Sequence, residues 1–448
     1  MRIAAAAAAA IAVAGCSAGG GSSSVPAGSS KAAHHATAGP ITHVVFIIQE
    51  NRSFNNLFMG YPGATTQKYG YGTSGQKISL HSQTLATAWD ISHTSYSFFA
   101  ACDGTGSLPG TDCKMDGWNN EQVGLGHPAN FAYAYVPRNQ IQPYWKIAKQ
   151  YVLADEMFAS NLDGSFVAHQ YAVAAYSSKA VDDPSAEWGC DGIKGDAVPT
   201  LTKQRTYGSN IFPCFDNPTI GTDADAAGLS WRFYAMDLND PANIWSSYQA
   251  DGAVYDGPDW SADVINPPAQ FLTDVGKGQL ANITWIAPTL TTSDHAGLDA
   301  SGGPAWVASV VDAIGASKFW KSTAIFVMWD DWGGWCDPVQ PVYEDYDGLG
   351  FRVPLLIVSP YARKGSVTHV QYETSSVLRY IEDNFGLPQL STSDARASDP
   401  ANDPSAFDYG QPPRKFRKIA GSKPAAYWIR LERASHGHGK PGGIIGDD

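Results

Sequence analysis

Four side chains that offer oxygen ligands stand at the ends of two apolar runs in this sequence. They are Glu50, Asn51, Asp330 and Asp331. Carboxylate and amide oxygens are the ligands that hard divalent cations prefer. Three carboxylates held close together would repel each other strongly unless a cation neutralised them or a proton bound to one of them. If the two runs meet, the sequence therefore predicts a divalent metal site, with the identity of the metal left open.

The two apolar runs, Val44–Ile48 and Ala324–Trp329, are typical of strands that are buried on both faces of an α/β sheet. Ligands of such sheets bind beyond the carboxyl ends of the strands, which is where the four oxygen-bearing residues stand. Gly333–Gly334 follow the second run and allow the backbone to approach a ligand closely. The alternative is that the polar residues only cap helices or form turns.

Hydrolysis of an ester at a metal also needs a nucleophile, because the metal activates a hydroxyl group or a water molecule. We single out Ser165, which follows Gly164 and is expected to begin a helix whose first amides could hold a phosphate. The candidate acids or phosphate donors are His93, His169, His295 and His369. Among these, Asp294–His295 is favoured because it lies in the loop after a predicted strand. Each histidine could instead be a packed or surface residue.

The remaining hydrophobic pattern predicts strands that alternate with helices. Further strands are expected at residues 280–287 and 353–359, and helices at 143–152, 304–314 and 373–385. This alternation indicates an α/β protein with a mostly parallel central sheet that is covered on both faces. We expect a loop at 55–80 and loop-rich, cap-like insertions within about 177–260.

The amino terminus has the pattern of an export signal. Met1–Arg2 and an alanine-rich run to Ala14 precede Cys16, so residues 1–15 are expected to be a lipoprotein signal peptide. Cleavage before Cys16 and lipidation of its thiol would hold the protein to a membrane by acyl chains. An ordinary secretory signal is the alternative. Both predict an exported protein, either a cell-envelope lipoprotein or a secreted one.

The composition of the chain predicts its domain limits. Residues 16–39 are rich in Gly, Ser, Ala and Pro and are expected to be a flexible tether. Residues 40–434 are expected to form one catalytic domain, and residues 435–448 a disordered tail. The net charge of −13 argues against nucleic acid as a partner, because binding a phosphate backbone needs a basic surface.

Five cysteines follow Cys16. In an oxidising compartment, pairing of nearest neighbours favours the disulfides Cys102–Cys113 and Cys190–Cys214 and leaves Cys336 unpaired. No Cys or His spacing predicts a zinc site, so we interpret the cysteines as structural.

Four motifs, in this order, resemble those of the bacterial phosphoesterase family of phospholipases C and acid phosphatases. They are Gln49–Phe54 (QENRSF), Ser293–His295 (SDH), Trp329–Gly334 (WDDWGG) and Gly348–Pro354 (GLGFRVP). The resemblance covers residues 41–387, nearly the whole chain. It implies a core like that of alkaline phosphatase, an α/β/α sandwich, and a metal-assisted mechanism that passes through a phosphorylated enzyme.

The resemblance also implies roles for single residues. By matching position, Ser165 would be the nucleophile, and His295 and His93 would contact the phosphate or the leaving group. The metal ligands would be Glu50, Asn51, Asp330 and Asp331.

The sequence departs from the family's pattern in three places. Asp163–His169 lacks the proline and asparagine that surround the nucleophile in the family. Ala296 replaces the proline after His295, and Trp335–Pro338 lacks a histidine that many members have.

We therefore expect a metal-dependent phosphoesterase that hydrolyses phospholipids or phosphomonoesters, as a phospholipase C or an acid phosphatase, through a phosphoseryl intermediate. One alternative is a catalytically impaired, surface-binding lipoprotein, which the altered surroundings of Ser165 suggest. The other is a polysaccharide hydrolase with paired carboxylates, suggested by the 14 tryptophans and the surplus of acidic residues.

Overall fold

Eight strands form the central sheet of the protein, in the order β13-β6-β12-β11-β1-β10-β8-β9. The structure is a computed structural model and describes residues 39–185, 188–238, 245–298 and 300–435. The strands of the sheet are β1 (His43–Gln49), β6 (Val152–Ala154), β8 (Trp231–Tyr234), β9 (Val264–Ile265), β10 (Ile283–Ile286), β11 (Thr323–Trp329), β12 (Leu355–Val358) and β13 (Ser366–Thr368). All of their pairings are parallel except the two that β12 makes.

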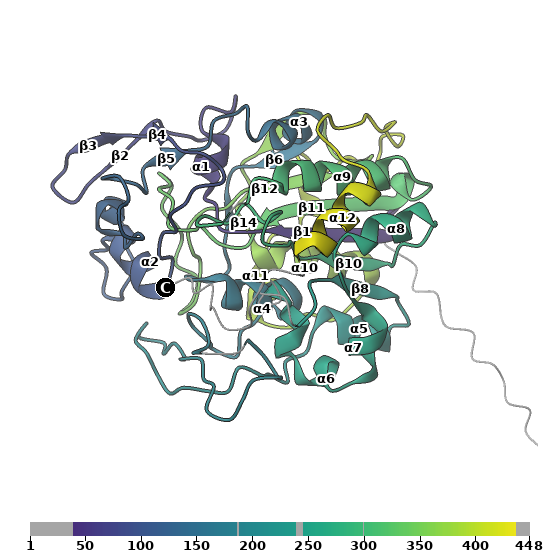
Figure 1. The fold of residues 1–448 in the computed structure, drawn as a ribbon, viewed down its shortest axis with the longest axis horizontal. Coiled ribbons are helices and arrows are strands. Elements are labelled where there is room, and N and C mark those ends of the chain that lie inside the picture. Colours follow the sequence, from purple (N-terminus) through teal and green to yellow (C-terminus); the bar gives the residue numbers. More distant parts are fainter. Residues whose placement is uncertain (1–38, 186–187, 239–244, 299, 436–448) are drawn as a thin grey trace, which may run out of the picture. The chain divides into compact units, whose positions relative to one another are not determined.

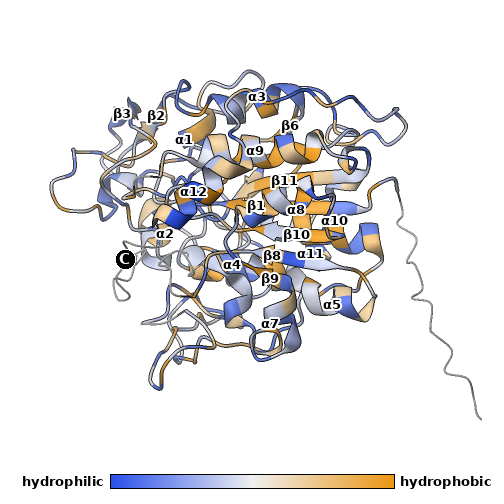
Figure 2. Ribbon diagram, turned by 45° about the vertical axis from the view of Figure 1, so that its right-hand side comes forward, coloured by the Kyte–Doolittle hydropathy of each residue, from blue (hydrophilic) through white to orange (hydrophobic). Residues whose placement is uncertain are grey.

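Burial explains why the predicted strands lie at the centre of the sheet. Every residue of β10, β11 and β12 is buried, as are the six residues of β1 after His43. Such strands bury apolar side chains on both faces, so they read as continuous hydrophobic runs, and Figure 2 shows the apolar residues gathered along them. The predicted strands, and the mostly parallel sheet, are confirmed.

Helices cover both faces of the sheet (Figure 1). They are α1 (Phe54–Phe58), α2 (Ser95–Cys102), α3 (Gln142–Gln150), α4 (Ser165–Ala174), α5 (Ile220–Ala226), α6 (Gly252–Tyr255), α7 (Pro258–Asp263), α8 (Gln270–Gly276), α9 (Gly303–Gly315), α10 (Thr374–Phe385), α11 (Thr392–Arg396) and α12 (Ala425–Ser435). Helices α3, α8, α9 and α12 pack together on one face, and α4, α10 and α11 on the other. The α/β/α sandwich is confirmed, and α3, α9 and α10 lie at the predicted positions.

The prediction of a loop at 55–80 was wrong in part, because the segment also contains a helix and two short strands. Helix α1 begins there, capped by the Ser53 hydroxyl, which accepts a hydrogen bond from the amide of Asn56. Strands β2 (Tyr69–Tyr71) and β3 (Lys77–Ser79) then form a hairpin. All five residues of α1 are buried, so tertiary packing rather than local propensity stabilises this short helix.

Two further small sheets pair β4 (His81–Ser82) with β5 (Ala134–Tyr135) and β7 (Met157–Phe158) with β14 (Tyr372–Glu373). Strand β8 of the central sheet lies inside the region 177–260, for which we predicted insertions. The predicted signal peptide, the tether up to residue 38 and the tail from 436 lie outside the described residues.

The structure confirms the predicted disulfides Cys102–Cys113 and Cys190–Cys214. Cys336 is free and buried. Burial is the main reason that the pKa of its thiol is raised well above the ordinary value, and the charge of Asp337 adds to the effect.

A fully buried ion pair joins segments that are far apart in the sequence. The guanidinium of Arg352 donates to both carboxylate oxygens of Asp337, at 3.1 and 3.2 Å. It also donates to the carbonyls of Asp155 and Thr65, at 2.7 and 3.0 Å. Asp337 in turn accepts the amide of Asn55 at 2.9 Å. The pair therefore fixes the loops that approach the carboxyl end of β1.

Replacing Asp337 by alanine tests this role. The substitution leaves the buried charge of Arg352 without its counter-ion, so we expect the free energy of unfolding to fall by about 3–5 kcal/mol. Urea unfolding measures the change. Asp383→Ala is the matched control, because it breaks an exposed ion pair with Arg379 and should cost less than about 1 kcal/mol. Equal losses in the two variants would contradict the prediction.

Candidate active site

The carboxyl ends of β1 and β11 lie side by side. The two strands are parallel and in register, with Gln49 opposite Trp329. Beyond them, the amide of Asp330 donates to the Gln49 carbonyl at 2.9 Å, and the amide of Asn51 donates to the Asp330 carboxylate at 3.0 Å. Glu50 and Asp330 are thus neighbours, and both are at most 1% exposed.

The backbone at Gly333 lies close to the backbone at Asn51, just beyond the ends of β11 and β1. Gly333 has a φ of 58°, and a side chain on it would lie 2.1 Å from the Asn51 carbonyl oxygen. Glycine is therefore required at this position. Asn51 also has a positive φ, 53°, a conformation that asparagine tolerates better than most residues.

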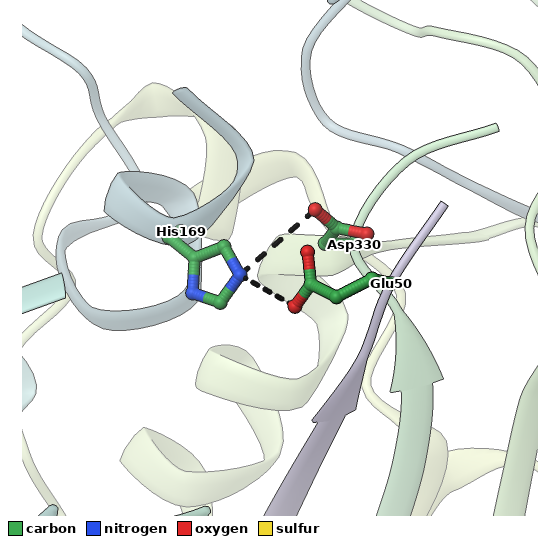
Figure 3. A group of neighbouring side chains, drawn as sticks. All are labelled: Glu50, His169 and Asp330. Carbon is green, nitrogen blue, oxygen red and sulfur yellow. Dashed lines mark hydrogen bonds and ion pairs between the residues drawn. The ribbon is translucent and has the colours of Figure 1, made fainter. Parts of the chain in front are cut away.

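His169 joins Glu50 and Asp330 in one buried cluster. Its Nε2 lies 3.0 Å from Glu50 Oε1 and 3.9 Å from Asp330 Oδ2, and the three side chains point toward one another (Figure 3). One ligand atom from each residue lies within 4.8 Å of the other two. Asp330 Oδ2 is buried and accepts no hydrogen bond from the described residues. A nitrogen and two carboxylate groups at this spacing fit a divalent metal ion.

Ser165 is the first residue of α4, and it lies beside this cluster. Its Oγ is 3.3 Å from Glu50 Oε2, 3.4 Å from Asn51 Oδ1 and 3.4 Å from Asp331 Oδ2. His169 follows Ser165 by four residues on the same helix, so both side chains project from one face of α4.

His93 contacts the same residues from the other side. Its Nε2 lies 2.6 Å from Asn51 Nδ2 and 3.8 Å from Asp331 Oδ2, and its Nδ1 lies 2.7 Å from the Ile91 carbonyl. The ring therefore donates from Nδ1 and accepts the amide of Asn51 at Nε2. This arrangement turns Asn51 Oδ1 toward Ser165.

His295 lies next to His93, with ring centroids 6.1 Å apart. Its Nδ1 donates to the carbonyl of Ala296, the residue that replaces the family's proline. The ring of Trp245 also lies near that of His295, with the two centroids 6.0 Å apart.

The structure thus brings the seven predicted site residues to one buried edge of the sheet: Glu50, Asn51, His93, Ser165, His295, Asp330 and Asp331, each at most 1% exposed. His369 lies elsewhere, because its side chain is 60% exposed and pairs with Asp155.

His169 was predicted only as an acid or phosphate donor and not as a metal ligand. Its spacing of four residues from Ser165 on a predicted helix was the signal that could have found it.

A second buried network lies behind the site. Asp294 Oδ2 accepts the Tyr144 hydroxyl at 2.6 Å and Trp329 Nε1 at 3.2 Å, and the Asp294 carbonyl accepts Arg52 Nε at 2.8 Å. Burial raises the pKa of Asp294 to about 7, although these hydrogen bonds and the charge of Arg52 oppose the shift. Burial also lowers the pKa of Arg52 to about 10.

Asp294→Asn tests this network through its pH dependence. Because the pKa of Asp294 is higher in the folded protein, folding binds a proton, and stability is lost as pH rises from about 4 to about 7. We expect the stability of the wild type relative to the variant to fall by about 2–3 kcal/mol between about pH 5 and about pH 8. Urea unfolding at the two pH values measures it, and a difference that stays constant with pH would refute it.

Known proteins share this sequence pattern. The sequence model of the Phosphoesterase family matches residues 41–388. Phospholipase C B of Mycobacterium tuberculosis is 25% identical over 455 aligned residues, which cover 86% of this chain and 81% of that protein. The non-hemolytic phospholipase C of Pseudomonas aeruginosa is 24% identical and is aligned over 84% of this chain and 58% of its own length.

Solved structures show a weaker likeness. A protein of the alkaline phosphatase superfamily from Vibrio parahaemolyticus has 10% identity and a TM-score of 0.37, covering 79% of this chain and 69% of that chain. The sequence match alone identifies the family, because it spans most of the chain and includes the predicted site residues. The chain belongs to the Phosphoesterase family of ester-bond hydrolases.

Proposed function

We propose that this protein is a metal-dependent enzyme that hydrolyses phosphate esters through a phosphoseryl intermediate on Ser165. The observation that supports it best is the position of Ser165 Oγ, within 3.4 Å of oxygens of Glu50, Asn51 and Asp331. The substrate is a phospholipid, as the names of the relatives suggest, or a phosphomonoester.

Glu50, His169 and Asp330 would hold the metal, with Asn51 and Asp331 beside them. When bound, a divalent ion supplies positive charge that lowers the pKa of a neighbouring hydroxyl group and offsets charge on phosphoryl oxygens.

The side chains of the protein carry the proton transfers. The Ser165 hydroxyl gives its proton to a carboxylate that it contacts, Glu50 or Asp331, as Oγ forms a bond to phosphorus. His295 protonates the leaving alcohol as its bond to phosphorus breaks, and it then accepts a proton from the water that attacks the phosphoserine. As the bond between phosphorus and Oγ breaks, the protonated carboxyl group returns its proton to Ser165. His93 accepts one N–H of Asn51 Nδ2 and so holds this amide in place. The second N–H of Asn51 Nδ2 would donate to a phosphate oxygen.

We further propose that the protein is exported and lipid-anchored through Cys16, as its signal pattern predicts. Within the ranges that the structure describes, no helix combines the length and the apolar character needed to cross a bilayer. An acyl anchor would instead supply the attachment to the membrane.

Activity assays test the proposed reaction. The purified protein should hydrolyse p-nitrophenyl phosphate or phosphatidylcholine, and a chelator should abolish the hydrolysis. Ser165→Ala should lower kcat by at least about 1000-fold, while Ser165→Thr should keep a usable hydroxyl and part of the activity. Mass spectrometry of acid-quenched reactions should find phosphate on the peptide with Ser165. Turnover that persists in Ser165→Ala would exclude this nucleophile.

His169→Ala tests the metal cluster separately. Removing one of three ligands should weaken metal binding by about 10–100-fold or more, measured by calorimetric titration of the apo protein with zinc and manganese ions. His369→Ala is the matched control, because this exposed histidine lies away from the cluster. An unchanged affinity in His169→Ala would show that the metal binds elsewhere.

A further inference from the structure

A pocket of about 650 Å³ on the surface is lined by basic side chains. Lys318, Lys321, Arg414 and Lys415 line it, and no carboxylate does. The three lysines are exposed, while the floor includes the buried ring of Trp320. Such a concentration of positive charge is unexpected in a chain with a net charge of −13.

The four cations have no carboxylate partner among the described residues, where the ion pairs involve other side chains. Asp312 on α9 accepts the amide of Ile419 at 2.7 Å and interacts with Lys418, which does not line the pocket. The charge of the pocket is therefore not neutralised from within the described chain.

Arg414 is held rigidly at the edge of this pocket. Its two terminal nitrogens donate to the carbonyls of Gln150 and Ala362, at 3.1 and 2.8 Å, and its guanidinium lies over the ring of Tyr151. Its Nε is buried and has no hydrogen-bond partner. Arg414 therefore supplies a fixed positive charge, and the three exposed lysines supply N–H donors, which together suit an anion with several oxygens.

The pocket lies at the amino edge of the sheet, opposite the candidate active site. Trp320–Ser322 precede β11, and the Ser322 carbonyl accepts the amide of Thr42, just before β1. Both strands are seven residues long, which separates their two ends by roughly 20 Å. The pocket is thus distinct from the metal cluster.

We propose that this basic pocket binds a phosphate group, presented by the headgroup of an anionic phospholipid or by free inorganic phosphate. Binding would be electrostatic, and it requires several cationic side chains that are not already paired with carboxylates of the protein. The predicted tether, residues 16–39, joins the described chain at this same edge. A lipid anchor on Cys16 would keep the protein close to membrane headgroups, and each lysine of the pocket would add to the attraction.

Vesicle sedimentation tests the proposal on the full chain with Cys16→Ser and Ser165→Ala, so that neither an acyl group nor lipid hydrolysis interferes. The protein should bind vesicles that contain phosphatidylglycerol, and not vesicles of phosphatidylcholine alone. Lys318→Gln, Lys321→Gln and Lys415→Gln together should weaken binding about 100-fold, from a factor of about 5 for each lysine. Binding should also weaken as salt is added.

The matched control replaces Lys179, Lys194 and Lys203 by glutamine, because these lysines are exposed and the change in net charge is the same. It should bind like the starting protein, and thermal melting should show that both triple variants are folded. Calorimetry with inorganic phosphate separates the two sources: binding of phosphate but not of vesicles would assign the pocket to the free anion. Equal binding by the two triple variants to both probes would overturn the proposal.

Discussion

Repulsion between the buried carboxylates of Glu50, Asp330 and Asp331 is the constraint on which the site depends. Charges of one sign that are removed from water cost several kcal/mol each unless a counter-charge is present. The pairing of β1 with β11 forces these groups together, and the burial of the two strands stabilises that pairing. A cation held by Glu50, His169 and Asp330, as proposed above, would offset this repulsion.

Successive side chains of a strand point to opposite faces of the sheet, so neighbouring residues at this edge have different roles. Glu50 and Asp330 face the site, while their neighbours Gln49 and Trp329 face the opposite side. There Trp329 and Tyr144 bind Asp294, the residue before His295. The same few positions thus build the site and the support that holds it, so the motifs are short and contiguous in the sequence.

Simple patterns were sufficient to predict the centre of the fold. Apolar runs located β1 and β11, and their polar ends led to the convergence of Glu50 with Asp330. Ser165 needed the family resemblance, because one serine among many has no distinguishing local pattern. The Arg352–Asp337 pair was not predictable, since its partners lie on irregular segments and meet only through tertiary packing. Helix α1 was missed for the same reason, because burial and not propensity stabilises it.

The buried thiol of Cys336 has a consequence for oxidative folding. Thiol–disulfide exchange requires a thiolate, and the raised pKa of this group keeps it protonated once the chain is folded. The disulfides of this protein join cysteines only 11 and 24 residues apart, so each closes a short loop. Cys336 can therefore exchange with the two disulfides only before it is buried. After folding, its burial protects the native pairing of the cysteines.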